Sequence, residues 1–239
     1  MVVQTVFQRY ELKYLLTRSQ RDKILEAMRT HMALDQYGRT TIRNLYFDTD
    51  NYRLVRRSIE RPVYKEKLRI RSYEQARPES TVFVEIKKKY RSIVYKRRIA
   101  LTERAAMEWT LGGKFHENET QISREVDYFL YYYETLHPVM FLSYEREAYY
   151  SLDGSDFRVT FDDNVLCRQE DLSLTSDIGG IPLLDEDTVL MEIKCSGGIP
   201  LWMIHILSEE HLGKTSFSKY GTAYQSIIYP ELKEAVIHV

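Results

Sequence analysis

Basic side chains recur at every second position in residues 63–74. Lys67, Arg69 and Arg71 alternate there with Leu68 and Ile70. Because successive side chains of a strand point to opposite faces, this spacing predicts a strand with one cation-rich face and one apolar face. Arginine and lysine side chains match phosphate oxygens well, so the cation-rich face is a candidate anion-binding surface.

The same alternation returns in other segments, where each basic residue shares a face with another polar residue. These sets are Arg9 and Lys13 with Glu11, Lys87 with Glu85, Lys96 with Arg98, Arg146 with Tyr144, Arg158 with Thr160, and Lys194 with Glu192. One interpretation is that these are the solvent faces of a one-sided sheet. The other is that the sheet closes with its apolar side outward, so that the cations converge and need a polyanion between them. The concentration of cations on so many segments favours the second interpretation.

Three acids, Glu11, Glu85 and Glu192, lie on the same faces as these cations. A carboxylate within a phosphate site commonly serves Mg²⁺ or Mn²⁺. The alternative is that each glutamate only pairs with a neighbouring lysine or arginine. Both interpretations stay open for Glu11 and Glu85, whereas we favour metal binding for Glu192.

The elements that must position these residues follow from the hydrophobic pattern. Thr17 and Gln20 form a capping-box pattern that opens a helix to about residue 32. Asp153-Gly154 is a hairpin turn signal. We expect strands at 6–16, 41–48, 63–74, 81–90, 92–101, 139–151, 156–162 and 187–195, with a further short strand at 163–168. We expect the other helices at 50–58, in two segments between residues 101 and 139 of which the second is 119–136, and at 200–211 and 217–228.

Strands that follow one another without alternating helices indicate an antiparallel sheet rather than βαβ units. No Gly/Ser-rich linker divides the chain, so we expect one domain over residues 1–239. We expect an α+β fold, in which about eight strands close into an antiparallel β-barrel tunnel with the helices packed outside.

The composition limits the function classes. The 239 residues are 44% hydrophobic and carry a net charge of −1, from 34 basic and 35 acidic residues. A protein that coats nucleic acid is usually basic, so no nucleic-acid partner is expected. Residues 1–10 lack a signal-peptide pattern, and no apolar run is long enough to cross a bilayer. We therefore expect a soluble cytoplasmic protein, and any membrane-protein partner is not visible in the sequence.

Several motifs follow one another along the chain: RYELKYLL (9–16), KLRIRSYE (67–74), VFVEIKKKY (82–90), YKRR (95–98), SYEREAYYS (143–151), FRVTFDDN (157–164), LMEIKCSGGIP (190–200) and FSKYGTAY (217–224). This ordered set resembles the VTC domain, the polyphosphate polymerase domain of the vacuolar transporter chaperone complex. That family belongs to the triphosphate tunnel (CYTH-like) superfamily.

The resemblance implies that the γ-phosphate of ATP passes to a polyphosphate chain in a basic tunnel, with Mn²⁺ or Mg²⁺ as cofactor and ATP, triphosphate or polyphosphate as partners. It assigns Glu192 to the metal, and Glu11 and Glu85 remain candidate metal ligands from the strand faces. It assigns catalytic contacts to Lys13, Arg69, Arg71, Lys87, Arg146 and Arg158, and substrate contacts to Lys96, Tyr144, Ser218 and Lys219. The strand faces add Arg9, Lys67, Arg98 and Lys194 as candidate substrate contacts.

Two features of the motifs depart from relatives. Many hydrolases of the superfamily begin with ExExK, whereas RYELK here places Arg9 at the first acidic position. This removes a potential metal ligand and argues against hydrolysis with two metals. Ser216 also precedes FSK, where the eukaryotic polymerases are expected to have a lysine.

Two alternatives to phosphotransfer remain open. The first is hydrolysis of triphosphate or a nucleoside triphosphate, with Glu11 or Glu85 activating water. The second is a non-catalytic module that binds polyphosphate or RNA, since basic strands with tyrosines resemble single-strand binding surfaces.

Overall fold

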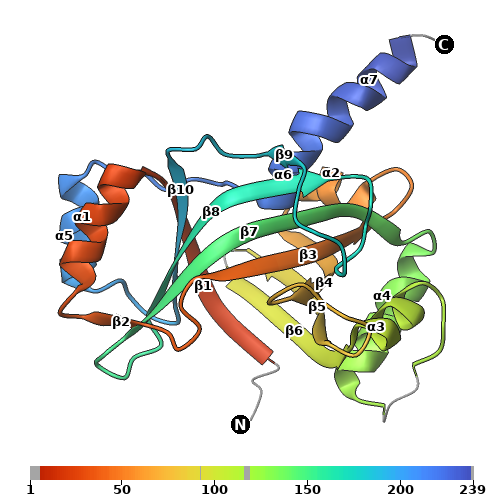
Figure 1. The fold of residues 1–239 in the computed structure, drawn as a ribbon, viewed down its shortest axis with the longest axis horizontal. Helices are drawn as coiled ribbons and strands as arrows, with labels where there is room; N and C mark the ends of the chain where they lie inside the picture. The colour runs from red at the N-terminus through yellow and green to blue at the C-terminus, as the bar shows by residue number, and fades with distance from the viewer. Residues whose placement is uncertain (1–5, 92, 116–118, 238–239) are drawn as a thin grey trace.

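The computed structural model describes residues 6–91, 93–115 and 119–237. Within them a mixed α/β fold is built on one large antiparallel sheet (Figure 1). The strands are β1 (Val6–Thr17), β2 (Met32–Leu34), β3 (Thr40–Asp48), β4 (Tyr64–Ser72), β5 (Thr81–Tyr90), β6 (Ile93–Thr102), β7 (His137–Ser151), β8 (Arg158–Arg168), β9 (Ile181–Pro182) and β10 (Thr188–Cys195). The helices are α1 (Arg18–Met28), α2 (Arg53–Ile59), α3 (Glu103–Thr110), α4 (Gln121–Tyr133), α5 (Leu201–Glu209), α6 (Lys219–Ala223), the π-helix η1 (Tyr224–Ile228) and α7 (Tyr229–Ile237).

The sheet order is β2-β7-β3-β4-β5-β6-β1-β10-β8-β9, and β7 also pairs with β8. Strand β1 changes partner along its length. Residues 6–9 pair with β6, and residues 10–17 pair with β10. No described residue of β1 therefore pairs with both β6 and β10, and hydrogen bonding does not establish the closed barrel expected from the sequence. The sequence analysis is confirmed for the large antiparallel sheet.

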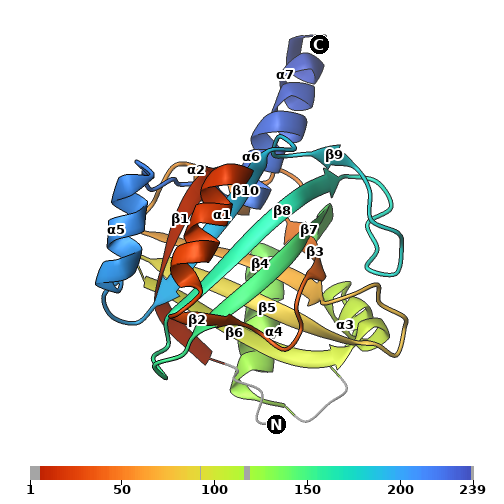
Figure 2. The ribbon, with the colours of Figure 1, turned by 60° about the vertical axis from the view of Figure 1, so that its left-hand side comes forward.

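One face of the sheet is apolar, and helices lie over it (Figure 2). Helices α3 and α4 pack against β5 and β6, in a core that buries Leu68, Val84 and Trp109. Helices α1 and α5 lie side by side over β1, β8 and β10. Each buried side chain of this kind contributes roughly 1.5–3 kcal/mol, so this face holds the helices to the sheet.

The capping box at the end of β1 forms as predicted. The Thr17 side chain accepts a hydrogen bond from the Gln20 backbone N–H, and the Gln20 side chain accepts one from the Thr17 N–H. This satisfies two free donors of the first helical turn, so the chain passes directly from β1 into α1.

Helix α6 corrects the expectation that all helices pack on the outside. Tyr220 stacks on Tyr46 of β3, with ring centroids 4.8 Å apart, and its hydroxyl donates to Asp48 at 2.8 Å. Tyr46 belongs to the face that also carries Arg69, since the two residues are paired. Helix α6 therefore lies against the cation-bearing side of the sheet.

Other boundaries also differ from prediction. Residues 163–168 are not a separate strand, because β8 runs on through Asp162 and Asp163. Aspartates are depleted in strands, but Arg146 and Arg39 hold these two in place. The structure adds the short strands β2 and β9, and the helix expected at 217–228 divides into α6 and η1 and continues as α7. Among the helices of the described residues, none combines the length and hydropathy that a bilayer crossing needs.

Candidate phosphate-binding site

Basic side chains from many strands meet on one side of the sheet, which we call the cation-bearing face. The strand register brings them together, since Arg69 pairs with Glu85 across β4 and β5, and Lys13 pairs with Glu192 across β1 and β10. The face comprises Lys13, Lys67, Arg69, Arg71, Lys87, Lys96, Arg146 and Lys194 from the strands, and Lys219 from α6.

Glu85 is the centre of a first ion cluster and is completely buried. Its Oε2 atom lies 2.7 Å from Arg69 Nη2, and its Oε1 atom lies 2.6 Å from Lys96 Nζ. Burial opposes ionisation of Glu85, but the charges of Arg69, Arg71 and Lys96 hold its pKa well below the usual range. The carboxylate is therefore firmly ionised and serves to hold these cations in position.

Glu192 is the centre of a second cluster. Its oxygens lie 3.1 Å from Lys13 Nζ, 3.0 Å from Lys194 Nζ and 3.5 Å from Arg146 Nη2. Burial again opposes ionisation, yet the lysines hold the pKa of Glu192 well below its usual value. Burial lowers the pKa of Lys194 to about 8 although Glu192 counteracts it.

Asp162 extends the second cluster and was not singled out from the sequence. It accepts from Arg146 Nε at 2.5 Å and from Arg146 Nη2 at 2.6 Å, and it also accepts from Lys219 Nζ. The signal was present, because the spacing of Arg158 and Thr160 continues to Asp162 two residues on. The predicted strand break after residue 162 concealed it.

Arg71 is buried and held by uncharged partners. Its Nε donates to Asn44 Oδ1 at 2.9 Å, and its Nη2 donates to the Tyr144 hydroxyl at 2.9 Å. The nearest distance between Arg71 and Glu85 is 4.0 Å. Neutral hydrogen-bond partners orient a guanidinium without cancelling its charge, so Arg71 can still attract an anion.

The segment before α6 closes over the same face. Lys13 Nζ donates to the Phe217 carbonyl at 3.0 Å, and Lys67 Nζ donates to Ser218 Oγ at 2.9 Å. Ser218 also caps α6 by accepting from the Gly221 N–H. The predicted Ser218 and Lys219 therefore reach the cation-bearing face from the far end of the chain.

The remaining predicted residues are placed less centrally. Lys87 pairs with Glu11 at 2.6 Å. Arg98 stacks on the Phe83 ring at 4.6 Å and donates to the Tyr73 hydroxyl at 3.4 Å. Arg158 is exposed and lies outside the buried clusters. The side chain of Arg9 lies outside the described part of the chain.

The carboxylates of this face could hold a divalent metal only together with the oxygens of a bound phosphate compound. Across residues 6–91, 93–115 and 119–237, no three His, Cys, Asp or Glu side chains are grouped as a metal site. Glu11, Glu85 and Glu192 all pair with cations, as in the simpler interpretation of the sequence. Glu11 and Glu192 are nevertheless close enough to raise each other's cost of ionisation. Mg²⁺ commonly takes one or two carboxylates together with phosphate oxygens and water, which these two acids fit.

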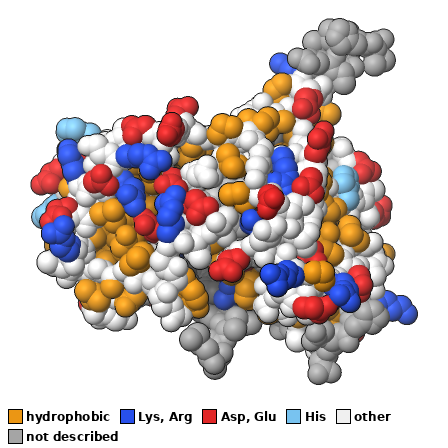
Figure 3. Space-filling view, in the orientation of Figure 1, with side chains coloured by type: hydrophobic (Ala, Val, Ile, Leu, Met, Phe, Trp, Pro, Cys, Tyr) orange, Lys and Arg blue, Asp and Glu red, His pale blue; other side chains and the backbone are white. Residues whose placement is uncertain are grey.

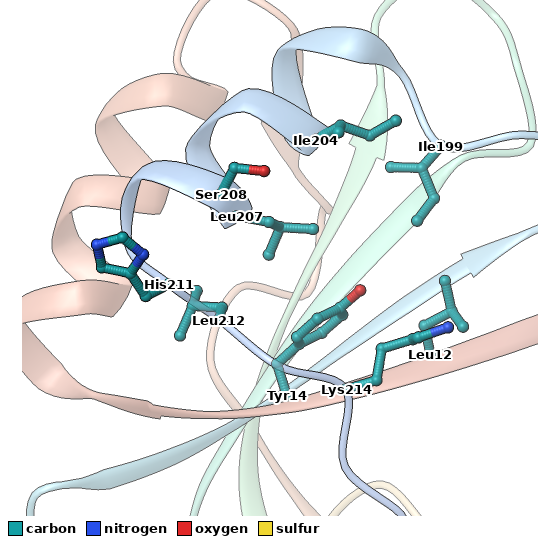
Figure 4. Close-up of a pocket in the computed structure, with 9 residues that line it drawn as sticks. All are labelled: Leu12, Tyr14, Ile199, Ile204, Leu207, Ser208, His211, Leu212 and Lys214. Atoms are coloured by element: carbon teal, nitrogen blue, oxygen red, sulfur yellow. The ribbon is translucent and has the colours of Figure 1, made fainter.

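The outer surface contrasts with this face. In the view of Figure 3, basic and acidic side chains intermix on the surface and form no patch of one sign. A separate pocket of about 320 Å³ lies between α5 and the opposite side of β1, where Tyr14, Leu207 and His211 are among the lining residues (Figure 4). Leu12 and Tyr14 alternate with Glu11 and Lys13, so this pocket belongs to the helix-covered side.

The VTC domain model matches residues 8–228, and the chain therefore belongs to the VTC domain family. No curated protein matches significantly. Among solved structures, a Bacillus halodurans protein described as a candidate adenylate cyclase superposes with a TM-score of 0.55 at 15% identity, covering 90% of this chain and 96% of the other. A Hippeastrum candidate adenylyl cyclase, described as having a dominant triphosphatase activity, superposes with a TM-score of 0.53 at 14% identity, covering 92% and 95%. At these identities the likeness concerns the fold.

Proposed function

We propose that the cation-bearing face binds the triphosphate of ATP and the end of a polyphosphate chain, and transfers the γ-phosphate between them. The observation that carries this proposal is the excess of cations over carboxylates on this largely enclosed face, where most of the cations are partly buried. Glu11, Glu85, Asp162 and Glu192 face a larger set of lysines and arginines drawn from β1, β4, β5, β6, β7, β10 and α6. A polyanion would supply the charge that this set lacks.

We infer further that the strands enclose this face as a tunnel. The support is that the strand pairs form a circuit in which each member pairs with at least two others, even though β1 divides its length between its partners. The members of the circuit are β1, β3, β4, β5, β6, β7, β8 and β10. An enclosed site would exclude bases and favour an unbranched phosphate chain.

In this mechanism the protein positions charges and does not form covalent bonds. Arg71 and Arg69 would bind oxygens of the phosphate chain, because their fixed hydrogen bonds to tyrosine hydroxyls preset their orientation. Lys13, Lys194 and Arg146 would offset the charge that develops on the transferred phosphoryl group. The acceptor phosphate is already anionic, so no general base is needed.

A divalent ion would fit at Glu192 with Glu11, and Mn²⁺ or Mg²⁺ would there neutralise charge on the phosphate oxygens.

The lowered pKa values of Glu11 and Glu85 argue against hydrolysis. A water-activating carboxylate should have a pKa near the working pH. Lys87 lowers the pKa of Glu11 to about 2 against the opposing effect of burial, and Glu85 is likewise held ionised by its cations.

The deciding experiment is incubation with ATP and Mn²⁺, followed by gel separation of the products. We expect ADP and a ladder of polyphosphate chains. Phosphate released from ATP without chains would instead identify a hydrolase, and retention of polyphosphate without turnover would identify a binding module. For any variant that removes a cation of the site, the control is Arg77→Ala, which removes an exposed cation of the β4–β5 turn and changes the net charge equally.

Binding should weaken as the pH rises above 7. Burial lowers the pKa of Lys67 to about 7, and the nearby charges of Lys13 and Lys65 add to this effect. A bound phosphate chain favours the charged form, so affinity should fall by up to about tenfold per pH unit above the lowered pKa. The free energy of unfolding of the empty protein should instead increase as the pH rises through this range. The reason is that the unfolded state binds more protons than the folded state between the lowered pKa of Lys67 and its ordinary value of 10.5.

Calorimetry with tripolyphosphate from below pH 7 to about pH 9 measures how the affinity changes with pH. The matched variant is Lys67→Arg, whose guanidinium stays protonated and should flatten the profile. An unchanged slope in this variant would mean that another group, or tripolyphosphate itself, sets the pH dependence.

A further inference from the structure

An arginine lies buried on the side of the sheet opposite the cation-bearing face. Arg43 of β3 is only 6% exposed. Its Nε and Nη1 atoms have no hydrogen-bond partner within the described residues. Arginine remains protonated inside proteins, so a buried guanidinium without partners is strongly unfavourable.

Two buried serines, whose hydroxyls also lack hydrogen-bond partners among the described residues, flank Arg43. Arg43 pairs with Ser72 on β4 and with Ser143 on β7, so the three side chains form one row across adjacent strands. A row of buried donors that all lack acceptors points to a missing acceptor.

The charges of two acids and one further arginine act on Arg43. The pKa of Arg43 is lowered, mainly by burial and further by the charge of Arg168. Asp177 and Glu145 act against this shift, but their oxygens accept hydrogen bonds from other groups. Asp177 Oδ1 accepts from Gln75 at 3.3 Å, and Glu145 Oε1 accepts from Thr41 at 2.8 Å. A water molecule would satisfy donors here without compensating the charge, whereas an anion would do both.

We propose that Arg43, Ser72 and Ser143 form a binding site for a small oxyanion of the phosphate or sulfate type, separate from the cation-bearing face. The row spans two strand spacings, about 9–10 Å. A tetrahedral oxyanion presents acceptors in several directions and can contact such a row better than a halide. Larger anions such as nucleotides do not fit at a buried position.

The loop at residues 169–180, between β8 and β9 (Figure 1), lies near this row, since the charges of Asp177 and Arg168 act on Arg43. It is held to the segment after β4 by hydrogen bonds from Gln75 Nε2 to the Thr175 carbonyl at 2.7 Å and from the Ala76 N–H to the Leu174 carbonyl at 3.1 Å. Arg168 lies at the start of this loop and donates to the Asp171 and Asp177 carbonyls. The loop therefore borders the row.

The site has a direct connection to the opposite face. The chain neighbours of Arg43, Ser72 and Ser143 are Asn44, Arg71 and Tyr144, which form the hydrogen-bonded group around the Arg71 guanidinium. An anion that bridges the row would fix the same three strands that orient Arg71.

A crystal structure of the protein grown with sodium selenate tests the site directly, because selenium gives an anomalous signal. A selenium peak that places selenate oxygens within hydrogen-bond distance of Arg43 supports the proposal. An ordered water alone at this position, or a bromide peak from a parallel crystal with no selenium peak, would overturn it.

Thermal unfolding in sulfate, compared with chloride at equal ionic strength, gives an independent measurement. The Arg69→Met variant weakens anion binding at the cation-bearing face, and its unfolding midpoint should still rise with sulfate. Adding Arg43→Met should reduce the rise to the general stabilisation by sulfate and the weakened binding at the cation-bearing face. The midpoint without sulfate should equal or exceed that of Arg69→Met alone, because an unpaired buried charge is removed. In a Ser72→Ala/Ser143→Ala variant of the Arg69→Met protein, which keeps Arg43, the rise should be reduced. An equal sulfate response in all these variants would refute the site.

Discussion

Replacing Glu192 by glutamine is expected to abolish turnover of ATP while leaving metal-free tripolyphosphate binding unchanged or tighter. Glu192 is the only acid that the structure records within 4 Å of Lys13 and Lys194 in the described residues, and it also lies 3.5 Å from Arg146. A carboxylate among phosphates repels them unless a divalent ion lies between. The glutamine keeps the shape of the side chain and removes both the repulsion and the metal ligand.

The measurement is turnover across a Mn²⁺ titration, with calorimetry of tripolyphosphate in chelator. The thermal unfolding midpoint of the empty variant should also fall, because an uncompensated buried charge costs about 3–5 kcal/mol. Glu79→Gln, an exposed pair partner of Arg104, makes the same charge change outside the site. Coincident Mn²⁺ curves for wild type and Glu192→Gln would show that Glu192 is structural.

The second large effect is expected at Arg71. The Arg71→Ala variant should lose roughly 10- to 150-fold in affinity for tripolyphosphate, since a charge-assisted hydrogen bond contributes about 1.5–3 kcal/mol. The fold should persist. The variant loses the hydrogen bonds to Asn44 and Tyr144, but it also loses the repulsion that Arg69 exerts on Arg71.

Calorimetry with tripolyphosphate, together with circular dichroism to verify folding, tests this expectation. The Arg77→Ala control removes one exposed arginine and therefore changes the net charge by the same amount as Arg71→Ala. If the folded Arg71→Ala protein bound tripolyphosphate as tightly as Arg77→Ala, the phosphate site would have to lie elsewhere.

The faces of the strands were the most predictable part of the molecule. Alternation at every second residue is a local property, so it placed Arg69 with Arg71 and Lys13 with Glu11 correctly before any pairing was known. The partners across strands follow once hairpin neighbours are assumed. The ion pair of Arg69 and Glu85, on consecutive strands, is of this kind.

Contacts between distant segments could not be predicted in the same way. The aromatic residues of α6 indicate a buried helix, but nothing in their spacing tells which side of the sheet buries it. The division of β1 between β6 and β10 depends on how all the strands are staggered, which no single segment encodes. Asp162 was missed for a different reason, because two adjacent aspartates look like a turn until their arginine partners are known.

The two ion clusters differ in how far along the chain their members lie, and this bears on the course of folding. Glu85 takes its cations from β4 and β6, the immediate neighbours of its own strand. Glu192 takes its cations from β1, β7 and α6 as well as from its own strand, and Lys13 reaches a carbonyl 204 positions away. Closing a longer loop costs more chain entropy, and non-local contacts slow folding. The β4–β6 meander can thus neutralise its buried acid early, whereas the charges around Glu192 stay incomplete until the two ends of the domain meet.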